Sequence, residues 1–416
     1  MLDHLTRRGF LACGVAAAAI PKLKISAVEL WQFEGERQAP AGANRQHQVQ
    51  PLHIYEERRP KEYVEPSSTP LTKSRITSIY LKLRTDSGVE GTYGPVDSEA
   101  AIVIDRQLKA FLMGKDPLAG ETLWDQMHRS NRHSRGGAYM MAISAADNAI
   151  WDLRGQYFKT PVYRLLGGPT KPAVEAYCST LGHSVQLDAV RRKAAEFKQM
   201  GFRNQKWFLA YGPGDGLPGL QKNVDLVRVL RETVGDDTDL MFDAFMGWNL
   251  DYAIAWAKRV EQYRPRWIEE AFHADKIDSF TQLRRSTSIP VASGEHFYGR
   301  WQTHDYLKAG AIRVVQADPE WCGGVSELVK ICNIASVFDA QVIPHGHSLH
   351  AALHVVASQS PMTCPLVEYL FGKMQSYYHF EKYQLEPVKG HIELPDRAGF
   401  GIEFDETKIL KRSQLT

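Results

Sequence analysis

The chain has 416 residues, of which 44% are hydrophobic and 24% are charged, and this composition excludes a disordered or fibrous protein. Its 50 lysines and arginines nearly balance its 48 acidic residues, and a net charge of +2 argues against a nucleic-acid partner, which requires a basic surface. Mean hydropathy is −0.34, and no apolar run reaches the about 18 residues of a membrane-spanning helix, so we expect no membrane span.

The first 20 residues differ from the rest of the chain. Thr6-Arg7-Arg8-Gly9-Phe10-Leu11 is followed by an apolar, alanine-rich stretch. A basic start before a short apolar segment is typical of a signal peptide, and the paired arginines before Phe-Leu resemble a bacterial twin-arginine export signal. We therefore expect a periplasmic protein. The alternative is an N-terminal helix with two chance arginines, in a cytoplasmic protein.

Residues 21–150 predict an α+β unit, because strand patterns come first and helical patterns follow. A polar stretch without periodicity, residues 38–74, predicts a long functional loop. One strand is predicted from Lys24, and two more cover residues 76–83 and 89–93 and are joined by a turn at Asp86-Ser87-Gly88. The predicted helices cover residues 99–113 and 138–155.

Residues 151–375 alternate short apolar runs with amphipathic helices, at a period near 25 residues. Eight such units predict an α/β fold of the (β/α)8 barrel type, with the N-terminal unit as a capping domain. A doubly wound sheet also alternates, but the glycine-rich phosphate loop expected after its first strand is missing. The expected strands are 174–178, 204–209, 240–244, 266–270, 290–293, 312–317, 341–344 and 366–369. We expect the last segment, 376–416, to pack back on the cap.

Three carboxylates end successive predicted strands of the barrel. Asp243, Glu269 and Glu295 are separated by 26 residues each, which is one strand-helix unit. Barrel enzymes carry their chemistry at the carboxyl ends of the strands, so these side chains should converge. Three close negative charges require a cation, and oxygen ligands suit Mg²⁺. The spacing therefore predicts a magnesium site.

The next three strands end in further polar groups. Asp318 follows Glu295 by 23 residues, His345 follows Asp318 by 27, and Glu368 ends the eighth strand. A carboxylate on a neighbouring strand can bond one ring nitrogen of a histidine and raise its basicity. A metal site beside such an imidazole predicts removal of a proton from the carbon next to a carboxylate.

The chain resembles the enolase superfamily, in its mandelate-racemase-like branch, over nearly all of residues 22–405. Within that branch it is similar to the L-rhamnonate dehydratase group of acid-sugar dehydratases. The strings that carry the resemblance begin at Asn148 (NAIWDL), Pro161 (PVYRLLGG), Leu240 (LMFD), Trp267 (WIEE), Ser293 (SGEH), Asp318 (DPEWCGG), Pro344 (PHG) and Pro395 (PDRAGFG).

The resemblance implies a role for each strand-end residue. Asp243, Glu269 and Glu295 would bind Mg²⁺, and His345 paired with Asp318 would be the base. Glu368 matches a carboxyl group that hydrogen-bonds the substrate carboxylate. Relatives also form even-numbered assemblies, so we expect a homo-oligomer.

The second barrel strand departs from the pattern of many relatives, which carry Lys-x-Lys there. This chain has Lys206-Trp207-Phe208, and phenylalanine cannot move a proton. Racemisation needs proton-transfer groups on both faces of the substrate, whereas a dehydratase can work with His345 alone, which takes the α-proton and then returns it to the departing β-hydroxyl. Lys206 is either close to the substrate carboxylate or a solvated structural lysine.

Other candidates for substrate binding are His53, Arg59 and Lys73, in or near the polar loop, and His296, next to Glu295. Cationic and hydrogen-bonding groups suit a polyhydroxylated anion, although a solvated run of charges is the simpler interpretation of the loop residues. His347 stands where the resembled group usually has a small hydroxyl residue.

The leading hypothesis from the sequence is a Mg²⁺-dependent dehydratase that converts an aldonic acid into a 2-keto-3-deoxy acid. The alternatives are another α-proton reaction, such as epimerisation, racemisation or cycloisomerisation, and an exported sugar-acid binding protein without turnover. Phe208 argues against the first alternative, and the oriented imidazole argues against the second.

Overall fold

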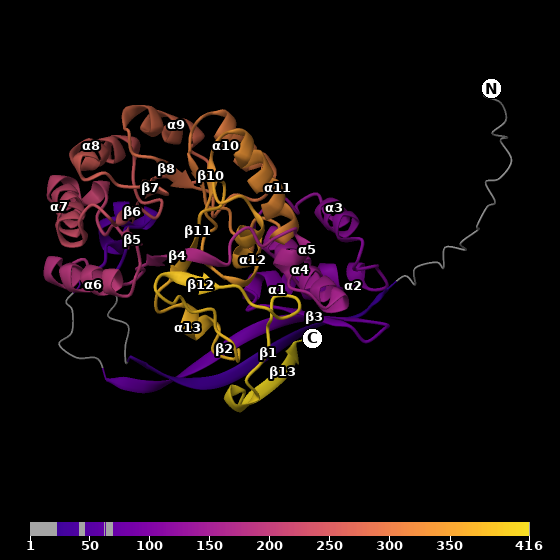
Figure 1. The fold of residues 1–416 in the computed structure, drawn as a ribbon. Coiled ribbons are helices and arrows are strands. Elements are labelled where there is room, and N and C mark those ends of the chain that lie inside the picture. Colours follow the sequence, from indigo (N-terminus) through magenta and orange to yellow (C-terminus); the bar gives the residue numbers. More distant parts are fainter. Residues whose placement is uncertain (1–22, 41–45, 62, 64–69, 416) are drawn as a thin grey trace, which may run out of the picture.

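The computed structural model describes residues 23–40, 46–61, 63 and 70–415. The predicted export signal, residues 1–20, lies outside this range. Among the described residues, no helix is both long and apolar enough to cross a membrane. The described chain forms two sheets, an antiparallel sheet in the cap and a parallel sheet in the barrel (Figure 1).

The cap sheet has the strand order β13-β1-β2-β3. Its strands are β1 (Ile25–Pro40), β2 (Leu71–Thr85), β3 (Glu90–Tyr93) and β13 (Lys411–Leu415). The C-terminal strand β13 pairs with β1 in an antiparallel register, Leu30 opposite Leu415, so the end of the chain lies on the cap.

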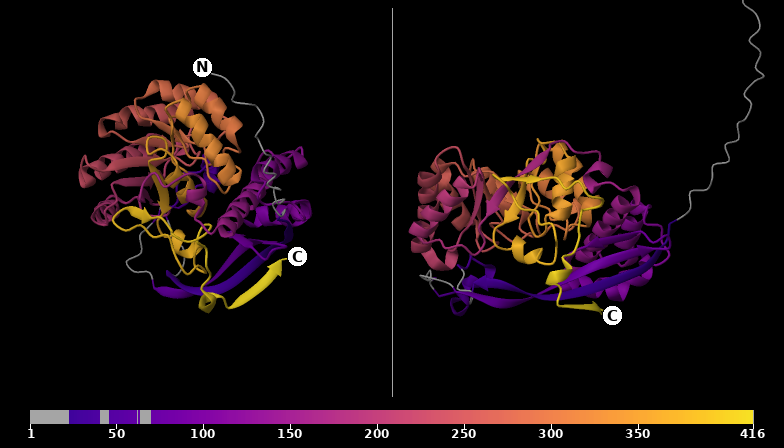
Figure 2. Two further views of the ribbon diagram at one scale, coloured as in Figure 1. Left: turned by 45° about the vertical axis from the view of Figure 1, so that its right-hand side comes forward. Right: turned by 60° about the horizontal axis from the view of Figure 1, so that its bottom comes forward.

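The prediction of a loop over the whole of residues 38–74 was wrong at both ends. β1 continues to Pro40 and β2 begins at Leu71, and Gln38 pairs with Lys73. The two long strands form a ribbon that extends from the cap past one side of the barrel (Figure 2). The outer half of β2 is mostly exposed, so it lacks the alternation of buried apolar residues from which a strand is recognised.

The cap helices are α1 (Ser98–Val103), α2 (Lys109–Leu112), α3 (Gly120–Ser130) and α4 (Gly137–Phe158), and a π-helical segment, Ile104–Leu108, joins the first two. The sequence patterns predicted all of these except α3. Helix α4 is buried on nearly every side, because it packs against β3 and α1 of the cap and against α11 of the barrel.

The eight-stranded parallel barrel sheet is confirmed. Its strands are β4 (Ala173–Ser179), β5 (Asn204–Phe208), β6 (Asp239–Asp243), β7 (Trp267–Glu269), β8 (Val291–Ser293), β9 (Val314–Val315), β10 (Gln341–Val342) and β11 (Leu366–Leu370). Neighbours pair in chain order from β4 to β10, and β11 pairs with β4. Val342 N donates to Thr363 O, which links β10 to the segment before β11. The short strand β12 (His391–Glu393) pairs antiparallel with β4.

Helices surround this sheet (Figure 1). They are α6 (Leu187–Gln199), α7 (Gly216–Val234), α8 (Leu250–Val260), α9 (Ile277–Ser286), α10 (Arg300–Lys308), α11 (Gly324–Val337) and α12 (His350–Ser358). Two further short helices are α5 (Val162–Leu165), which packs against α4 and α12, and α13 (Met374–Tyr377), which follows β11.

The barrel interior explains where the site residues point. One buried cluster inside the barrel contains Tyr177, Met241, Trp267, Ala292, Val314, Ile343 and Leu366. Successive side chains of a strand face opposite ways, so residues two positions further along face inward again, one layer closer to the mouth. Asp243, Glu269, His345 and Glu368 occupy such positions above Met241, Trp267, Ile343 and Leu366.

Helix α4 fixes the loop that carries Asp318. The Asn148 side chain donates to Pro319 O at 3.0 Å and accepts from Val325 N at 2.9 Å. Asp147 accepts from both the backbone and the hydroxyl of Ser326, at 2.9 and 2.7 Å. These buried bonds satisfy the start of α11 and hold the loop after β9 against the cap.

Candidate active site

A buried lysine lies among three of the strand-end carboxylates. Lys206 Nζ is 2.9 Å from Glu368 Oε1 and 3.2 Å from Asp243 Oδ2, and it also contacts Glu269 Oε1. The lysine is only 1% exposed, so the interpretation of a solvated lysine was wrong. Glu269 uses its second oxygen to accept from Trp267 Nε1 at 2.9 Å.

One ammonium does not balance the acids of this site. Burial raises the pKa of Glu269 to about 8, although Lys206 opposes the shift. Burial also raises the pKa of Asp243, and burial together with Glu295 raises the pKa of Glu270 well above its ordinary range. Burial alone would lower the pKa of Lys206, but Glu269 and Glu368 outweigh it and raise that pKa. The site therefore holds an excess of buried acid, which a divalent cation would neutralise.

A second group of candidate ligand atoms lies beside the first. Glu270, Glu295 and His296 each offer an atom within 4.8 Å of the others, the single such trio in the part of the chain that the structure describes. His296 Nε2 is 3.3 Å from Glu295 Oε1. Of the predicted ligands, only Glu295 belongs to this trio, since Asp243 and Glu269 are turned toward Lys206. The assignment of Asp243, Glu269 and Glu295 as metal ligands stays a prediction.

The backbone directly after two of these carboxylates is unusual. Phe245, Met246 and Glu270 have φ values of 45°, 59° and 42°, in the left-handed region that residues other than glycine rarely adopt. Met246 N donates to Glu270 O at 2.6 Å and holds this conformation. Strained backbone of this kind concentrates at functional sites, where the surrounding structure maintains it.

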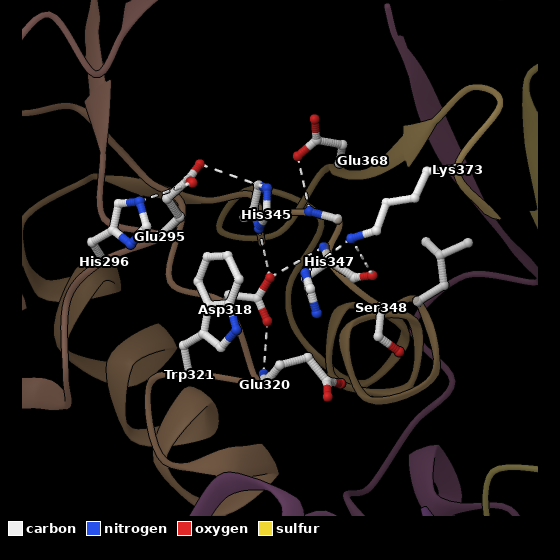
Figure 3. Close-up of polar contacts among 12 residues, drawn as sticks. Glu295, His296, Asp318, Glu320, Trp321, His345, His347, Ser348, Glu368 and Lys373 are labelled. Atoms are coloured by element: carbon white, nitrogen blue, oxygen red, sulfur yellow. Dashed lines mark hydrogen bonds and ion pairs between the residues drawn. The ribbon is translucent and has the colours of Figure 1, made fainter. Parts of the chain in front are cut away.

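The structure brings His345 and Asp318 together (Figure 3). His345 Nδ1 is 2.7 Å from Asp318 Oδ2, and its other ring nitrogen, Nε2, lies 3.7 Å from Glu295 Oε2. Asp318 is fully buried and also accepts backbone N–H groups from Glu320 at 2.7 Å and His347 at 3.2 Å. With Nδ1 held by Asp318, the second ring nitrogen Nε2 is left toward the mouth.

Charge around the imidazole sets its basicity. Burial alone would lower the pKa of His345, but the negative charge of Glu295 and the hydrogen bond to Asp318 outweigh it and raise the pKa to about 9. A cation bound by Glu295 would weaken this effect. The imidazole is therefore a stronger base than a free histidine and lies directly beside the candidate metal ligands.

Glu368 is held from both sides of the mouth. Its Oε2 accepts from Gly346 N at 2.9 Å, and its Oε1 faces Lys206. A Cβ at position 346 would come within 2.8 Å of the Glu368 side chain, which explains the glycine after His345. Burial would raise the pKa of Glu368, but Lys206 and His345 lower it to about 2. The hydrogen bond predicted between Glu368 and a substrate carboxylate stays a prediction.

Sequence reasoning missed the groups that surround His345. The Trp321 ring stacks against His345, with centroids 5.1 Å apart, and against His296 at 5.4 Å. Its Nε1 donates to Asp97 Oδ2 of the cap at 3.2 Å, and Asp97 Oδ1 is 3.1 Å from His347 Nε2. Trp321 stands inside the recognised DPEWCGG string, so its position was available from the sequence, whereas no local pattern singles out Asp97.

His347 is therefore neither solvated nor free. Lys373 Nζ donates to His347 Nδ1 at 2.9 Å and to its carbonyl oxygen at 3.2 Å (Figure 3). A lysine donor at Nδ1 leaves the ring proton on Nε2, which donates to Asp97. The imidazole thus joins the cap to the loop after β11.

The structure does not place the remaining candidates with the carboxylates. Lys73 lies on β2, 72% exposed, with Glu36 Oε2 at 3.4 Å. His53 and Arg59 line a different cavity, of about 410 Å³, between cap residues 46–61 and 63 on one side and the start of α6 and residues 222–226 of α7 on the other. Arg59 Nε donates to His53 O at 3.0 Å. Substrate binding by these three residues stays a prediction.

Two family models match the chain. The N-terminal domain of mandelate racemase and muconate lactonizing enzyme matches residues 54–167, and the model described as enolase C-terminal domain-like matches residues 189–408. The chain belongs to the enolase superfamily. Both matches and the arrangement of cap and barrel place it in the mandelate racemase and muconate lactonizing enzyme branch, as the sequence strings predicted.

The curated relatives of this enolase superfamily member include sugar-acid dehydratases. It is 31% identical to the L-rhamnonate dehydratase of Saccharopolyspora erythraea, over 81% of this chain and 85% of the relative. It is 31% identical to the arabinonate dehydratase of Saccharolobus solfataricus, over 80% and 89%. The rhamnonate dehydratase of Gibberella zeae complexed with Mg superposes with a TM-score of 0.75 at 27% identity, over 92% and 95%. All three of these relatives are named as dehydratases, which are enzymes of the hydro-lyase type.

Proposed function

We propose that this protein is a Mg²⁺-dependent dehydratase that converts an aldonic acid into the corresponding 2-keto-3-deoxy acid. The observation that carries the proposal is the placement of His345, whose Nδ1 is bound by Asp318 at 2.7 Å while Nε2 faces Glu295 at 3.7 Å. An oriented base beside an excess of buried carboxylates suits removal of an α-proton from a metal-bound carboxylic acid.

The residues present fit a magnesium ion. Asp243, Glu269 and Glu295 supply carboxylate oxygens, which Mg²⁺ prefers. Burial raises the pKa values of Asp243 and Glu269, and repulsion from neighbouring carboxylates adds to both shifts, so a cation at this place would be stabilised. Bound there, Mg²⁺ would stabilise the second negative charge that forms on the substrate carboxylate when the α-proton leaves.

His345 performs both proton transfers in the proposed reaction. Nε2 takes the α-proton, which breaks the C–H bond, and Asp318 stabilises the imidazolium that forms. The imidazolium then gives its proton to the β-hydroxyl, which leaves as water while a C=C bond forms. The resulting enol becomes the 2-keto acid. Lys206, held protonated by the surrounding acids, is suited to bind the substrate carboxylate but not to act as a base.

Substitution of His345 by Asn tests the assignment. We expect loss of 2-keto acid formation from L-rhamnonate or another aldonic acid, and loss of α-proton exchange in D₂O, with Mg²⁺ binding retained. Full retention of both reactions in H345N would remove the basis of the proposal. Activity itself is found by screening the purified protein with Mg²⁺ against aldonic and aldaric acids.

Neighbouring glutamates offer a matched test of the metal ligands. Glu269 is a proposed ligand, whereas Glu270 belongs to the adjacent trio with Glu295 and His296. We expect E269Q to abolish the increase in melting temperature caused by Mg²⁺ and E270Q to keep most of it. The opposite ranking would assign the ion to the trio.

A racemase or epimerase is the second enzymatic candidate, because it shares the first proton transfer. Phe208 disfavours it: the ring is 7% exposed and lies at the β5 position where a second base would stand. Its centroid is 6.4 Å from that of Phe245. Recovered substrate with an inverted α-carbon and no keto acid would favour this candidate.

We further propose twin-arginine export of this protein, on the basis of Thr6-Arg7-Arg8-Gly9-Phe10-Leu11 and the apolar stretch that follows it in the sequence. Fusion of residues 1–25 to a reporter tests it, and export that persists after both arginines become lysine would contradict it. An exported sugar-acid binding protein without turnover is the related alternative, and tight binding of one acid with no product from any would support it.

A further inference from the structure

An arginine-rich groove of about 900 Å³ lies where the cap meets the barrel, at the end of α3, the loop after it and the start of α10. Four arginines line it: Arg129, Arg132 and Arg135 from the cap, and Arg300 from the barrel. None of the residues with a proposed catalytic or metal-binding role lines this groove, so it is a separate feature.

The acids of the groove are already paired. Asp125 accepts from Arg129 at 2.9 Å, and Glu121 accepts from Lys330 at 2.7 Å. Arg300 is bound by Glu327 at 2.8 Å.

Arg132 and Arg135 supply the excess positive charge. Both are exposed, and neither has a hydrogen bond or carboxylate partner among the described residues. Their guanidinium groups therefore face the groove with donors available for an anion, in the geometry that carboxylates bind best.

An aromatic stack forms a wall of the groove. The His128 ring lies between Trp124 and Trp301, with centroids 5.1 and 5.0 Å away and interplanar angles of 12° and 16°. Arg300 lies over the Trp301 ring at 4.8 Å. Trp301 is 51% exposed, an unusual position for tryptophan.

The groove adjoins the opening of the candidate active site. A second cavity, of about 430 Å³, is lined by His296, and the two cavities share Tyr298 and Gln302. The His296 side chain is 33% exposed and contacts Glu295 at 3.3 Å. Gly136, at the end of the arginine loop, packs so closely on Tyr298 that a Cβ would be 3.3 Å from the ring. A path along Tyr298 and Gln302 thus joins the arginines to the carboxylate site.

We infer that this groove captures the anionic substrate and delivers it to the barrel mouth. The inference rests on the proposed function, since it takes the substrate to be a small polyhydroxylated carboxylate. The site itself presents excess buried acid, which repels such an anion until a cation is bound. Positive groups at the entrance offset this repulsion and raise the local concentration of anions.

Charge reversal at the two unpaired arginines tests the inference in the Mg²⁺-loaded enzyme. At low salt, R132E/R135E should lower kcat/KM for the sugar acid about tenfold by raising KM. Added salt should reduce the difference in kcat/KM between the variant and the wild-type enzyme. R285E is the matched control, because Arg285 lies in the last turn of α9, is exposed and does not line the groove. Like the two groove arginines, it has no hydrogen bond or ion pair among the described residues. Equal kcat/KM and equal salt dependence in the two variants would overturn the inference.

A binding measurement separates this inference from the proposed reaction. Titration with L-rhamnonate in EDTA should give a saturable change in tryptophan fluorescence that W301F and R132E/R135E both lose. The uncharged lactone of the same acid should give no change. The fluorescence change should persist in H345N, because His345 does not line the groove. If the wild-type protein shows the change but dehydrates no acid, the proposed reaction is refuted and the capture site is not. Absence of the change from the wild-type protein would refute the capture site.

Discussion

Replacement of Lys206 by Met removes the ammonium that lies among Asp243, Glu269 and Glu368. Methionine keeps most of the volume and the unbranched shape of lysine, so the change isolates the charge. Lys206 is 1% exposed, and its Nζ lies 2.9 Å from Glu368 Oε1 and 3.2 Å from Asp243 Oδ2. Water therefore cannot replace the positive charge and hydrogen bonds that the ammonium group gives these carboxylates.

The structure sets the size of the effect. At an effective dielectric constant of about 20, one charge pair at such distances is worth about 5 kcal/mol, and the desolvation of buried lysine offsets part of that attraction. Removing one partner of a buried ion pair costs about 3–5 kcal/mol, and we expect K206M to lose that much free energy of unfolding at pH 7.

The loss should grow with pH. The pKa of Glu269 is about 8 in the folded protein against 4.5 ordinarily. A carboxyl group with a raised folded pKa favours folding fully below 4.5, and this contribution disappears as pH rises through 8. Without Lys206 the pKa of Glu269 rises further, so the variant depends more strongly on protonation. The deficit of K206M should therefore be larger at pH 8 than at pH 5.5.

Urea denaturation in EDTA at the two pH values measures this deficit. K411M is the control, because Lys411 pairs with Glu34 at 2.9 Å but its side chain is 64% exposed. Exposed pairs contribute up to about 1 kcal/mol, so K411M should lose no more than that. If K206M lost no more than K411M, or lost more at pH 5.5 than at pH 8, Lys206 would not be the counter-charge of the site.

Three further predictions concern residues near the site and its supports. His354 is fully buried with a pKa lowered to about 3, first by burial and then by His350. The neutral ring stabilises the fold above pH 6.5, so about 2 kcal/mol of stability should be lost between pH 7 and 5. In H354N, the decrease in the free energy of unfolding between pH 7 and pH 5 should be about 2 kcal/mol smaller than in the wild-type protein, as measured by denaturation at both pH values. H347S should destabilise by about 1–3 kcal/mol in urea, because Asp97 and Lys373 lose their shared partner; a change below 0.5 kcal/mol would argue against that network. G324A should lower the melting temperature by an amount that corresponds to about 1–3 kcal/mol, because φ is +83° and the new Cβ would lie 2.5 Å from the Asp147 carboxylate. An unchanged melting temperature would show that the backbone shifts freely there.

The barrel and the strand-end residues were predictable because the fold repeats. One strand and one helix recur about every 25 residues, so a carboxylate that ends one apolar run predicts where the next one should be. The pairing of Asp318 with His345 follows from the same rule, since their strands are neighbours. Helix α4 itself was predictable from its periodicity. Its role in holding the loop after Asp318 was not, because it depends on contacts between residues more than 170 positions apart in the chain.

Other features could not be read from local patterns. The extension of β1 and β2 is polar and exposed, so its strands carry no apolar alternation. The position of Lys206 among acids from β6, β7 and β11 depends on side-chain directions inside the barrel, although its strand was predicted. The cap loop offered His53 and Arg59 as plausible ligands by charge alone, and only the fold shows that they line a separate cavity.

The cap helps to orient His345, because Trp321 contacts Asp97 of the cap through its Nε1 and His345 through its ring. Asp97 lies at the start of α1 and binds Trp321 Nε1 and His347 Nε2 with its two oxygens. Trp321 stacks on the His345 ring, and the backbone of His347 binds the Asp318 oxygen that also holds His345. The imidazole is thus fixed by barrel strands through Asp318 and by the cap through Asp97. A barrel without its cap would keep the base, the Trp321 ring and the His347 amide, but it would lose the Asp97 carboxylate that binds both Trp321 and His347. The two domains together therefore form the site.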